Sequence, residues 1–229
     1  MGPDIRGRLI DGASRALALA YFGLLFWIAA AASLKVAPAV FAGTAGEAEV
    51  RTLLVKATAV AFSGLLVGVY LFRGRPVRQA QGLLPRVTAL LNAVVLPAAM
   101  VFPAGLGWVP STASTRVAVA GFVLVGVGHL VAVVVLAFLG RSFSILPEAR
   151  KLVTHGPYRI VRHPLYAAEL FAVAGIAMQH WSWWVALMVV AQLGVLLGRM
   201  HFEEQVLGAE FPEYAAYRAR TKRLIPRVW

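Results

Sequence analysis

The sequence predicts an all-α membrane protein, a polytopic helix bundle of about five to six membrane segments forming one transmembrane domain over residues 1–229. Composition is the first reason, because 60% of the 229 residues are hydrophobic and only 14% are charged. Soluble domains have roughly 45–50% apolar and about 25% charged residues. The second reason is that the apolar residues are collected in long segments, and about 20 such residues cross a bilayer as a helix.

Residues 1–139 contain four apolar segments, and a fifth apolar region follows in residues 140–229. The fifth region, Leu165–Gly198, is too long for one span of about 20 residues, and the polar stretch 179–182 interrupts it. It therefore predicts a helical hairpin with a short first leg. Pro97 and Pro103 predict a kink in the third segment. The four N-terminal segments are Ala16–Leu34, Leu53–Phe72, Val87–Leu106 and Val117–Leu139.

The basic residues are distributed asymmetrically about these segments. The chain has 22 Lys and Arg residues; apart from Lys35, Arg51, Lys56 and Arg116, they precede the first segment, lie in the second or fourth connection, or follow Gly198. Because cytoplasmic loops carry an excess of Lys and Arg, six crossings with both termini in the cytoplasm are predicted. The net charge of +12 then indicates contact with membrane lipids rather than nucleic acid. We expect the first segment to be retained, in a bacterial cytoplasmic membrane.

The stretch His155–Tyr166 is the densest group of polar and aromatic residues in the chain. It places two Arg, two His, two Tyr and two Pro between long apolar segments. Gly156-Pro157 predicts a turn, and Pro164 is suited to begin the hairpin's first helix. A helix N-terminus offers free N–H groups to a carboxylate or phosphate, so one interpretation is a ligand site. The alternative is a helix cap that contacts lipid phosphates.

Three further charged positions lie close to this stretch in the predicted topology. Arg199 and the pair Glu203-Glu204 follow the last apolar segment on the same side of the membrane, and Glu169 lies one turn inside the hairpin. Ionisable residues at membrane depth are functional by default, although structural ion pairs at a helix end would explain them equally well. His129, within the fourth segment, is expected to hydrogen-bond a neighbouring helix.

Three motifs in the C-terminal half resemble the signature of the isoprenylcysteine carboxyl methyltransferase and phospholipid methyltransferase superfamily of membrane enzymes. The resemblance extends from Leu139 to Pro226. Ala168 stands where the superfamily usually has Gly, and Glu169 follows it, as in some relatives. The motifs are Leu152–Tyr158, then Arg162-His163-Pro164-Leu165-Tyr166, then Glu203-Glu204 followed by Phe211-Pro212-Glu213-Tyr214 and Tyr217.

The resemblance implies an enzyme that binds S-adenosylmethionine at the cytoplasmic face and methylates a lipophilic or small acceptor. Arg199 matches an arginine implicated at the reacting substrate. Glu169 and His163 are candidate proton acceptors, which an amine acceptor would require. The positions that correspond to cofactor-binding residues are Leu152, Val153, Tyr158, His163, Pro164, Tyr166, Glu203 and Glu204.

Two other functions remain open from the sequence alone. Membrane sterol reductases carry a similar element and use NADPH; Glu169 fits their pattern, whereas Ala168 does not. A non-enzymatic lipid-binding or transport protein is the third interpretation. The chemistry of the acceptor (carboxylate, amine or thiol) and the oligomeric state are not indicated. No metal site is expected, because there is no Cys and the His residues are scattered. Gly126 and Gly128 lie inside a segment, where they are expected to pack helices.

Overall fold

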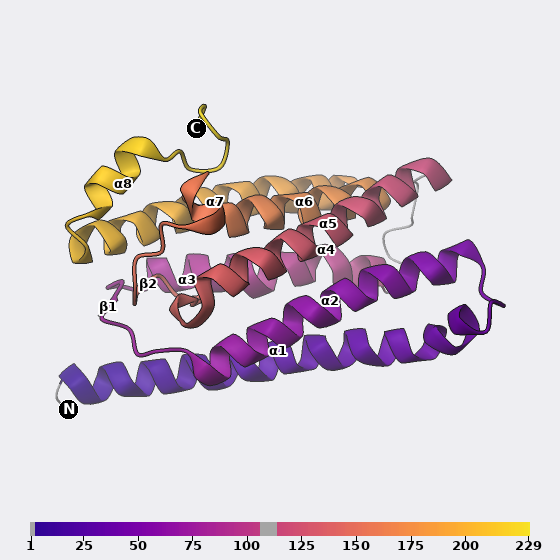
Figure 1. Ribbon diagram of the computed structural model, residues 1–229, viewed down its shortest axis with the longest axis horizontal. Coiled ribbons are helices and arrows are strands. Elements are labelled where there is room, and N and C mark those ends of the chain that lie inside the picture. Colours follow the sequence, from indigo (N-terminus) through magenta and orange to yellow (C-terminus); the bar gives the residue numbers. More distant parts are fainter. Residues whose placement is uncertain (1–2, 106–113) are drawn as a thin grey trace.

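The computed structural model describes residues 3–105 and 114–229, which form a bundle of long, roughly parallel and antiparallel helices (Figure 1). Four of the helices are long and apolar enough to cross a membrane. Two shorter apolar helical segments accompany them, in the regions of the third predicted segment and the first leg of the hairpin. The long helices are α1 (Pro3–Phe41), α2 (Glu47–Phe72), α5 (Thr115–Leu139) and α7 (Trp183–Glu210).

The third segment is interrupted by a π-helical turn. Helix α3 (Leu84–Leu90) passes into the π-helical residues Leu91–Val95 and then into α4 (Leu96–Gly105). The π turn ends just before Pro97, which has no N–H to donate to the preceding turn. The helix therefore departs from regular geometry where the sequence predicts a kink. The predicted end of this segment, Leu106, lies outside the described residues.

The predicted hairpin is confirmed. Helix α6 (Pro164–Gln179) begins with Pro164 in its first turn, and the Ser182 hydroxyl caps α7 by accepting a hydrogen bond from the Val185 N–H at 3.2 Å. Helix α7 then continues to Glu210, well beyond the predicted boundary at Gly198. Arg199 and the two carboxylates therefore lie on α7 itself, in fixed helical register with one another.

Helices α5 and α6 approach each other closely through small residues. A Cβ on Gly128 would lie 2.7 Å from the backbone oxygen of Ala168, and one on Gly175 would lie 2.4 Å from that of Gly121. Small residues permit such backbone contact between membrane helices. The backbone oxygen of Ala168 therefore lies directly against Gly128 on α5. The expected packing role is confirmed for Gly128, whereas a Cβ on Gly126 would meet no atom within 4 Å.

This crossing predicts opposite effects for two neighbouring substitutions. Gly128→Ala forces α5 and α6 apart and should destabilise the protein by about 1–3 kcal/mol, as overpacking generally does. Gly126→Ala is the matched control, and it should be neutral or stabilising by up to about 1 kcal/mol because alanine is the better helix former. Thermal unfolding in detergent measures both. Equal Tm values for the two variants would contradict the close crossing.

His129 joins α5 to α2, as the sequence analysis expected. Its Nδ1 lies 3.3 Å from the Thr58 hydroxyl, and its ring stacks on Phe62 with centroids 5.4 Å apart. A hydrogen bond between helices of this kind contributes about 0.6 kcal/mol on average within membranes. The contact is a helix-packing interaction between α2 and α5.

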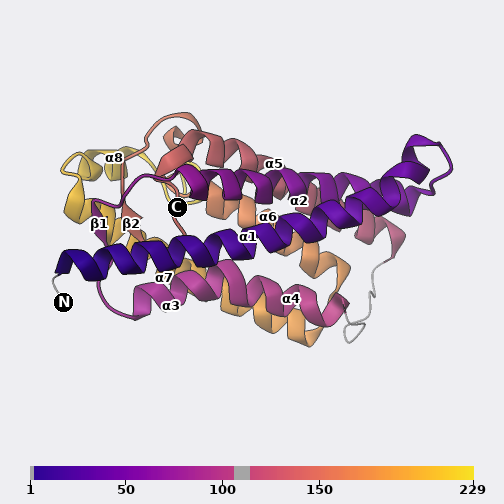
Figure 2. The ribbon, with the colours of Figure 1, turned by 90° about the horizontal axis from the view of Figure 1, so that it is seen from below.

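The connections at one end of the bundle contain a small sheet that an all-α prediction does not include. Strands β1 (Arg78–Gln79) and β2 (Glu148–Ala149) pair antiparallel. The chain start, the sheet and helix α8 (Tyr214–Arg220) gather at this end, and the C-terminus lies beside them (Figure 1, Figure 2). Two 3-10 turns, Gly140–Ser142 and Gly156–Arg159, complete the connections. The polar signature is thus surrounded by segments from both halves of the chain.

Candidate functional site

A cavity at this end of the bundle is bounded by α6, α7, α8 and the segment that precedes the signature. It brings together residues from all three sequence motifs. Its wall combines apolar side chains with Arg, His, Glu and Tyr. The predicted residues that line it are Leu152, Val153, Tyr158, His163, Tyr166, Arg199 and Glu203.

Glu203 is the centre of the polar contacts inside the cavity. The Tyr166 hydroxyl donates a hydrogen bond to Glu203 Oε1, and Arg199 Nε donates to the same oxygen at 3.1 Å. The Arg199 guanidinium also lies over the Tyr166 ring, 5.1 Å from its centroid. The His163 ring also stacks on the Tyr166 ring, with centroids 5.3 Å apart. One carboxylate and one guanidinium are therefore held in place beside the cavity.

Glu204 has a different environment from its neighbour. Its side chain is 5% exposed, and it pairs with Arg162 Nε at 3.0 Å, His163 Nε2 at 3.1 Å and Arg223 Nη2 at 3.0 Å. Successive residues on a helix point about 100° apart, since a turn takes 3.6 residues. Helix α7 therefore directs Glu203 into the cavity and Glu204 toward the C-terminal tail.

The tail is anchored to the signature by backbone bonds as well. The Arg162 N–H donates to the Lys222 carbonyl at 2.7 Å and the His163 N–H to the Arg223 carbonyl at 3.0 Å. The Arg162 side chain donates in addition to the Arg218 carbonyl at 3.1 Å. The sequence analysis did not predict this docking, because it depends on groups far apart in the chain. The tail thereby fixes the backbone that precedes α6.

Three tyrosines close the cavity on the side of α8. The Tyr217 hydroxyl donates to the Tyr158 carbonyl at 2.7 Å. Desolvation by burial raises the pKa of Tyr217 to about 12 and that of Tyr158 still further, so both stay neutral at physiological pH. Burial likewise raises the pKa of Tyr214. The buried Tyr214 hydroxyl has no hydrogen-bond partner among the described residues, which leaves it available to a ligand.

Glu169 lies deeper in the bundle, in a cluster contributed by three helical segments. Asn92 Nδ2 donates to its two carboxylate oxygens at 2.9 and 3.1 Å, and Gln192 Nε2 also donates to Oε1. Gln192 is fully buried and further contacts Asn92 Oδ1 at 3.2 Å. The π turn places Asn92 in this cluster. Glu169 is therefore stabilised by amide donors rather than by a direct bond to a signature arginine.

Not every predicted site residue lines the cavity: it excludes Pro164, Glu169 and Glu204. The cavity wall also includes three residues that were not predicted, Ser144, Glu148 and Arg150. The sequence contained a usable signal for Asn92 and Gln192, since each is an isolated polar residue within an apolar segment. It contained none for Glu148 or Arg150, because charged residues are ordinary in a loop between membrane segments.

Comparison with known families identifies the architecture around this cavity. Residues 116–213 match the model of the family described as phospholipid methyltransferase. This part of the chain belongs to the isoprenylcysteine carboxyl methyltransferase and phospholipid methyltransferase superfamily. The superfamily segment begins with α5 and ends just before α8, so α1, α2 and the tail that docks on the signature lie outside it.

Individual relatives match the chain over similar lengths, two of them named as metal-resistance proteins and one as a methyltransferase. The chain is 36% identical over 102 residues to the cobalt-zinc-cadmium resistance protein CzcN of Cupriavidus metallidurans, covering 41% of this chain and 45% of that protein. It is 31% identical over 100 residues to the nickel-cobalt-cadmium resistance protein NccN of Alcaligenes xylosoxydans xylosoxydans, covering 42% and 47%. A probable protein-S-isoprenylcysteine O-methyltransferase of Oryza sativa subsp. japonica is 32% identical over 108 residues, covering 42% and 55%. The matches thus span about half the length of these relatives.

Proposed function

We propose that this superfamily member is an integral membrane enzyme that transfers a methyl group from S-adenosylmethionine to a lipophilic or small acceptor. The observation that carries the proposal is the convergence of all three superfamily motifs on one cavity. The geometry is compatible with this chemistry, because the cavity pairs a held carboxylate, Glu203, with a held guanidinium, Arg199. No comparable observation favours the sterol-reductase or the non-enzymatic interpretation.

The donor set of the cavity fits S-adenosylmethionine. Its carboxylate suits Arg162 or Arg199, and its ammonium or ribose hydroxyls suit Glu203 and the Tyr214 hydroxyl. The apolar Leu152 and Val153 suit the adenine ring. When bound, the cofactor supplies an electrophilic methyl group on a sulfonium. The protein's contribution is to orient the reactants and exclude water around them, which accounts for a large share of catalysis in displacement reactions.

We assign the acceptor to the side of Arg199 that faces the membrane core. Arg199 is positioned by Glu203 and Tyr166, and it can orient an acceptor by its charge. An amine or thiol acceptor must release a proton, and we assign its acceptance to Glu169, a carboxylate within α6. A carboxylate acceptor needs no base. The acceptor enters laterally from the lipid between apolar helices.

We further propose that the end of the bundle with the cavity faces the cytoplasm. The basic residues of the second and fourth connections and of the tail lie at this end, together with the start of α1 (Figure 1). An excess of Lys and Arg marks cytoplasmic loops. The two shorter apolar helical segments are then the third and fifth of six crossings.

Calorimetric titration of the purified protein in detergent tests the proposed function. Saturable binding of S-adenosylmethionine without binding of NADPH is expected. Binding of NADPH alone would replace the methyltransferase with a reductase. Binding of neither compound would favour a lipid-binding or transport protein.

Substitution of Glu169 distinguishes a role in accepting the proton from a role in binding the cofactor. Glu169→Gln should leave the affinity for S-adenosylmethionine within about threefold of the original, since Glu169 does not line the cavity. With an amine acceptor, kcat should fall by about 10²- to 10⁴-fold, the usual contribution of a positioned base. Single-turnover kinetics measure this step. Undiminished turnover of an amine by the variant would show that another group accepts the proton.

A further inference from the structure

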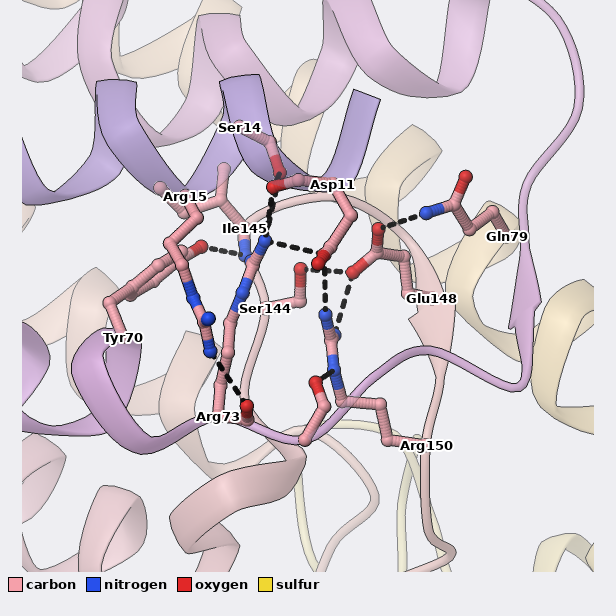
Figure 3. Close-up of polar contacts among 11 residues, drawn as sticks. Asp11, Ser14, Arg15, Tyr70, Arg73, Gln79, Ser144, Ile145, Glu148 and Arg150 are labelled. Carbon is pink, nitrogen blue, oxygen red and sulfur yellow. Dashed lines mark hydrogen bonds and ion pairs between the residues drawn. The ribbon is translucent and has the colours of Figure 1, made fainter. Parts of the chain in front are cut away.

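A second polar cluster joins the first helix of the chain to the wall of the cavity (Figure 3). Its members come from the start of α1, the end of α2, strand β1 and the segment 144–150. The cluster is outside the catalytic group described above, and its α1 and α2 residues lie outside the matched superfamily segment. Its labelled residues are Asp11, Ser14, Arg15, Tyr70, Arg73, Gln79, Ser144, Ile145, Glu148 and Arg150.

Asp11 connects the two arginines of this cluster. Arg73 Nη2 donates to Asp11 Oδ1 at 2.6 Å and to the Asp11 carbonyl at 2.9 Å. Arg150 Nη2 lies 3.5 Å from the same Oδ1. The Arg73 side chain is 0% exposed and that of Arg150 is 3% exposed. Two buried guanidinium groups therefore share the carboxylate of a residue in the first helix.

Arg150 and Glu148 carry the connection into the cavity wall. Arg150 Nη1 lies 2.6 Å from Glu148 Oε2, and Arg150 Nε donates to the Gly74 carbonyl at 2.9 Å. Glu148 also accepts hydrogen bonds from Ser144 at 2.7 Å and from Gln79 at 3.0 Å. Ser144, Glu148 and Arg150 all line the cavity. Their polar groups are engaged with one another, so they define the shape of the wall.

The cluster contains more donors than acceptors. Arg73 Nε and Nη1 and Arg15 Nε are buried without a hydrogen-bond partner among the described residues. The Arg73 guanidinium lies over the Tyr70 ring, 4.7 Å from its centroid, and the Tyr70 hydroxyl accepts a bond from the Ile145 N–H at 2.8 Å. Loss of one carboxylate from such a group leaves buried charge uncompensated. The segment 144–150 would then move so that water can reach the uncompensated guanidinium groups.

We infer that Asp11 is a positioning residue for the cofactor site and acts through Arg73 and Arg150 on the wall formed by Glu148. The inference rests on the proposed function, since the site is assigned to S-adenosylmethionine. It gives α1 a part in cofactor binding without any contact with the cofactor. Cofactor affinity consequently depends on a helix that the superfamily segment does not include.

Asp11→Asn tests the inference because it keeps the size of the side chain and removes its charge. We expect the Kd for S-adenosylmethionine to rise by about tenfold, with kcat at saturating cofactor unchanged. Hydrogen exchange of the Ile145 amide in the ligand-free protein should become faster. Asp11→Glu should restore part of the affinity.

Two control variants separate positioning from general stability and charge. Glu47→Gln removes an exposed carboxylate that pairs with Arg51, 3.4 Å away on α2. Thr58→Val removes a hydrogen bond between α2 and α5 that is outside the cavity, and it should lower Tm. Neither should change the Kd for S-adenosylmethionine.

The outcomes distinguish this inference from the proposed function. An Asp11→Asn variant whose Kd stays within twofold of the original overturns the inference alone. An equal rise in Kd for Thr58→Val also overturns it, since stability would then be the cause. Absence of S-adenosylmethionine binding by the unsubstituted protein overturns the proposed function and the inference together.

Discussion

Replacing Glu203 by Gln is expected to weaken binding of S-adenosylmethionine by about 30-fold or more. Glu203 is the only carboxylate among the described residues that bonds both Tyr166 and Arg199 beside the cavity. The variant leaves the Arg199 guanidinium without its charged partner and removes the acceptor for a cationic ligand group. Loss of one member of a buried charged pair costs about 2–5 kcal/mol, and 1.4 kcal/mol corresponds to tenfold in affinity. Calorimetric titration with S-adenosylmethionine measures the effect.

Tyr166→Phe should have a smaller effect than Glu203→Gln, because it removes one hydrogen bond to Glu203 and leaves the carboxylate in place. It removes the hydroxyl that donates to Glu203 but retains the ring under Arg199 and beside His163. Cofactor affinity should fall by about 2- to 12-fold, which corresponds to the roughly 0.5–1.5 kcal/mol that a typical hydrogen bond contributes. If Glu203→Gln binds the cofactor as tightly as the original protein, the cofactor assignment of this cavity is wrong.

Replacing the adjacent carboxylate, Glu204, should affect folding stability instead of cofactor affinity. Glu204→Gln leaves Arg162, His163 and Arg223 without their shared carboxylate. Breaking a buried ion pair by removing one partner costs about 3–5 kcal/mol. At about 2–4 °C per kcal/mol for a chain of this size, Tm should fall by at least about 6 °C. Thermal unfolding measured by circular dichroism in detergent gives this value.

The two carboxylates therefore form a matched pair of substitutions on one helix. Below its lowered Tm, the Glu204→Gln protein should bind S-adenosylmethionine within about threefold of the original affinity. Limited proteolysis should cut its tail near Lys222 and Arg223 more readily, because Arg162 no longer shares a carboxylate with it. A variant with unchanged Tm but lost cofactor binding would place Glu204 among the cofactor ligands, as the superfamily motif alone suggests.

Much of the fold could be predicted because its signals are local. The apolar segments, the break at 179–182 and the start of α6 at Pro164 each depend on neighbouring residues, and a helix occurs at each expected segment. Helix α1 extends beyond the predicted Ala16–Leu34 at both ends, and α7 extends beyond Gly198, because apolar length marks the span and not the end of the helix. The π turn near Pro97 was foreseen only as a kink. The small sheet of β1 and β2 was missed because each strand has two residues, too few for any periodic pattern.

The sequence predicted which residues belong to the candidate site better than it predicted how they are arranged. Motif positions named seven residues that line the cavity, but they could not distinguish Glu203 from Glu204. That distinction depends on the rotation of α7 against α6 and the tail, which is set by packing across the whole bundle. Asn92 and Gln192 stand out as isolated polar residues, but their pairing with Glu169 was hidden because they come from distant segments.

The sequence by itself determined that this is a membrane helix bundle carrying the signature of a methyltransferase superfamily. The length of hydrophobic segments and the presence of short motifs can be read from the chain without knowing any tertiary contact. Only the tertiary structure decided which of two adjacent carboxylates faces the cavity, and that Asp11 reaches its wall through Arg73 and Arg150. The physical reason is that buried charges are stabilised by partners brought together in folding, and sequence separation carries no record of those partners.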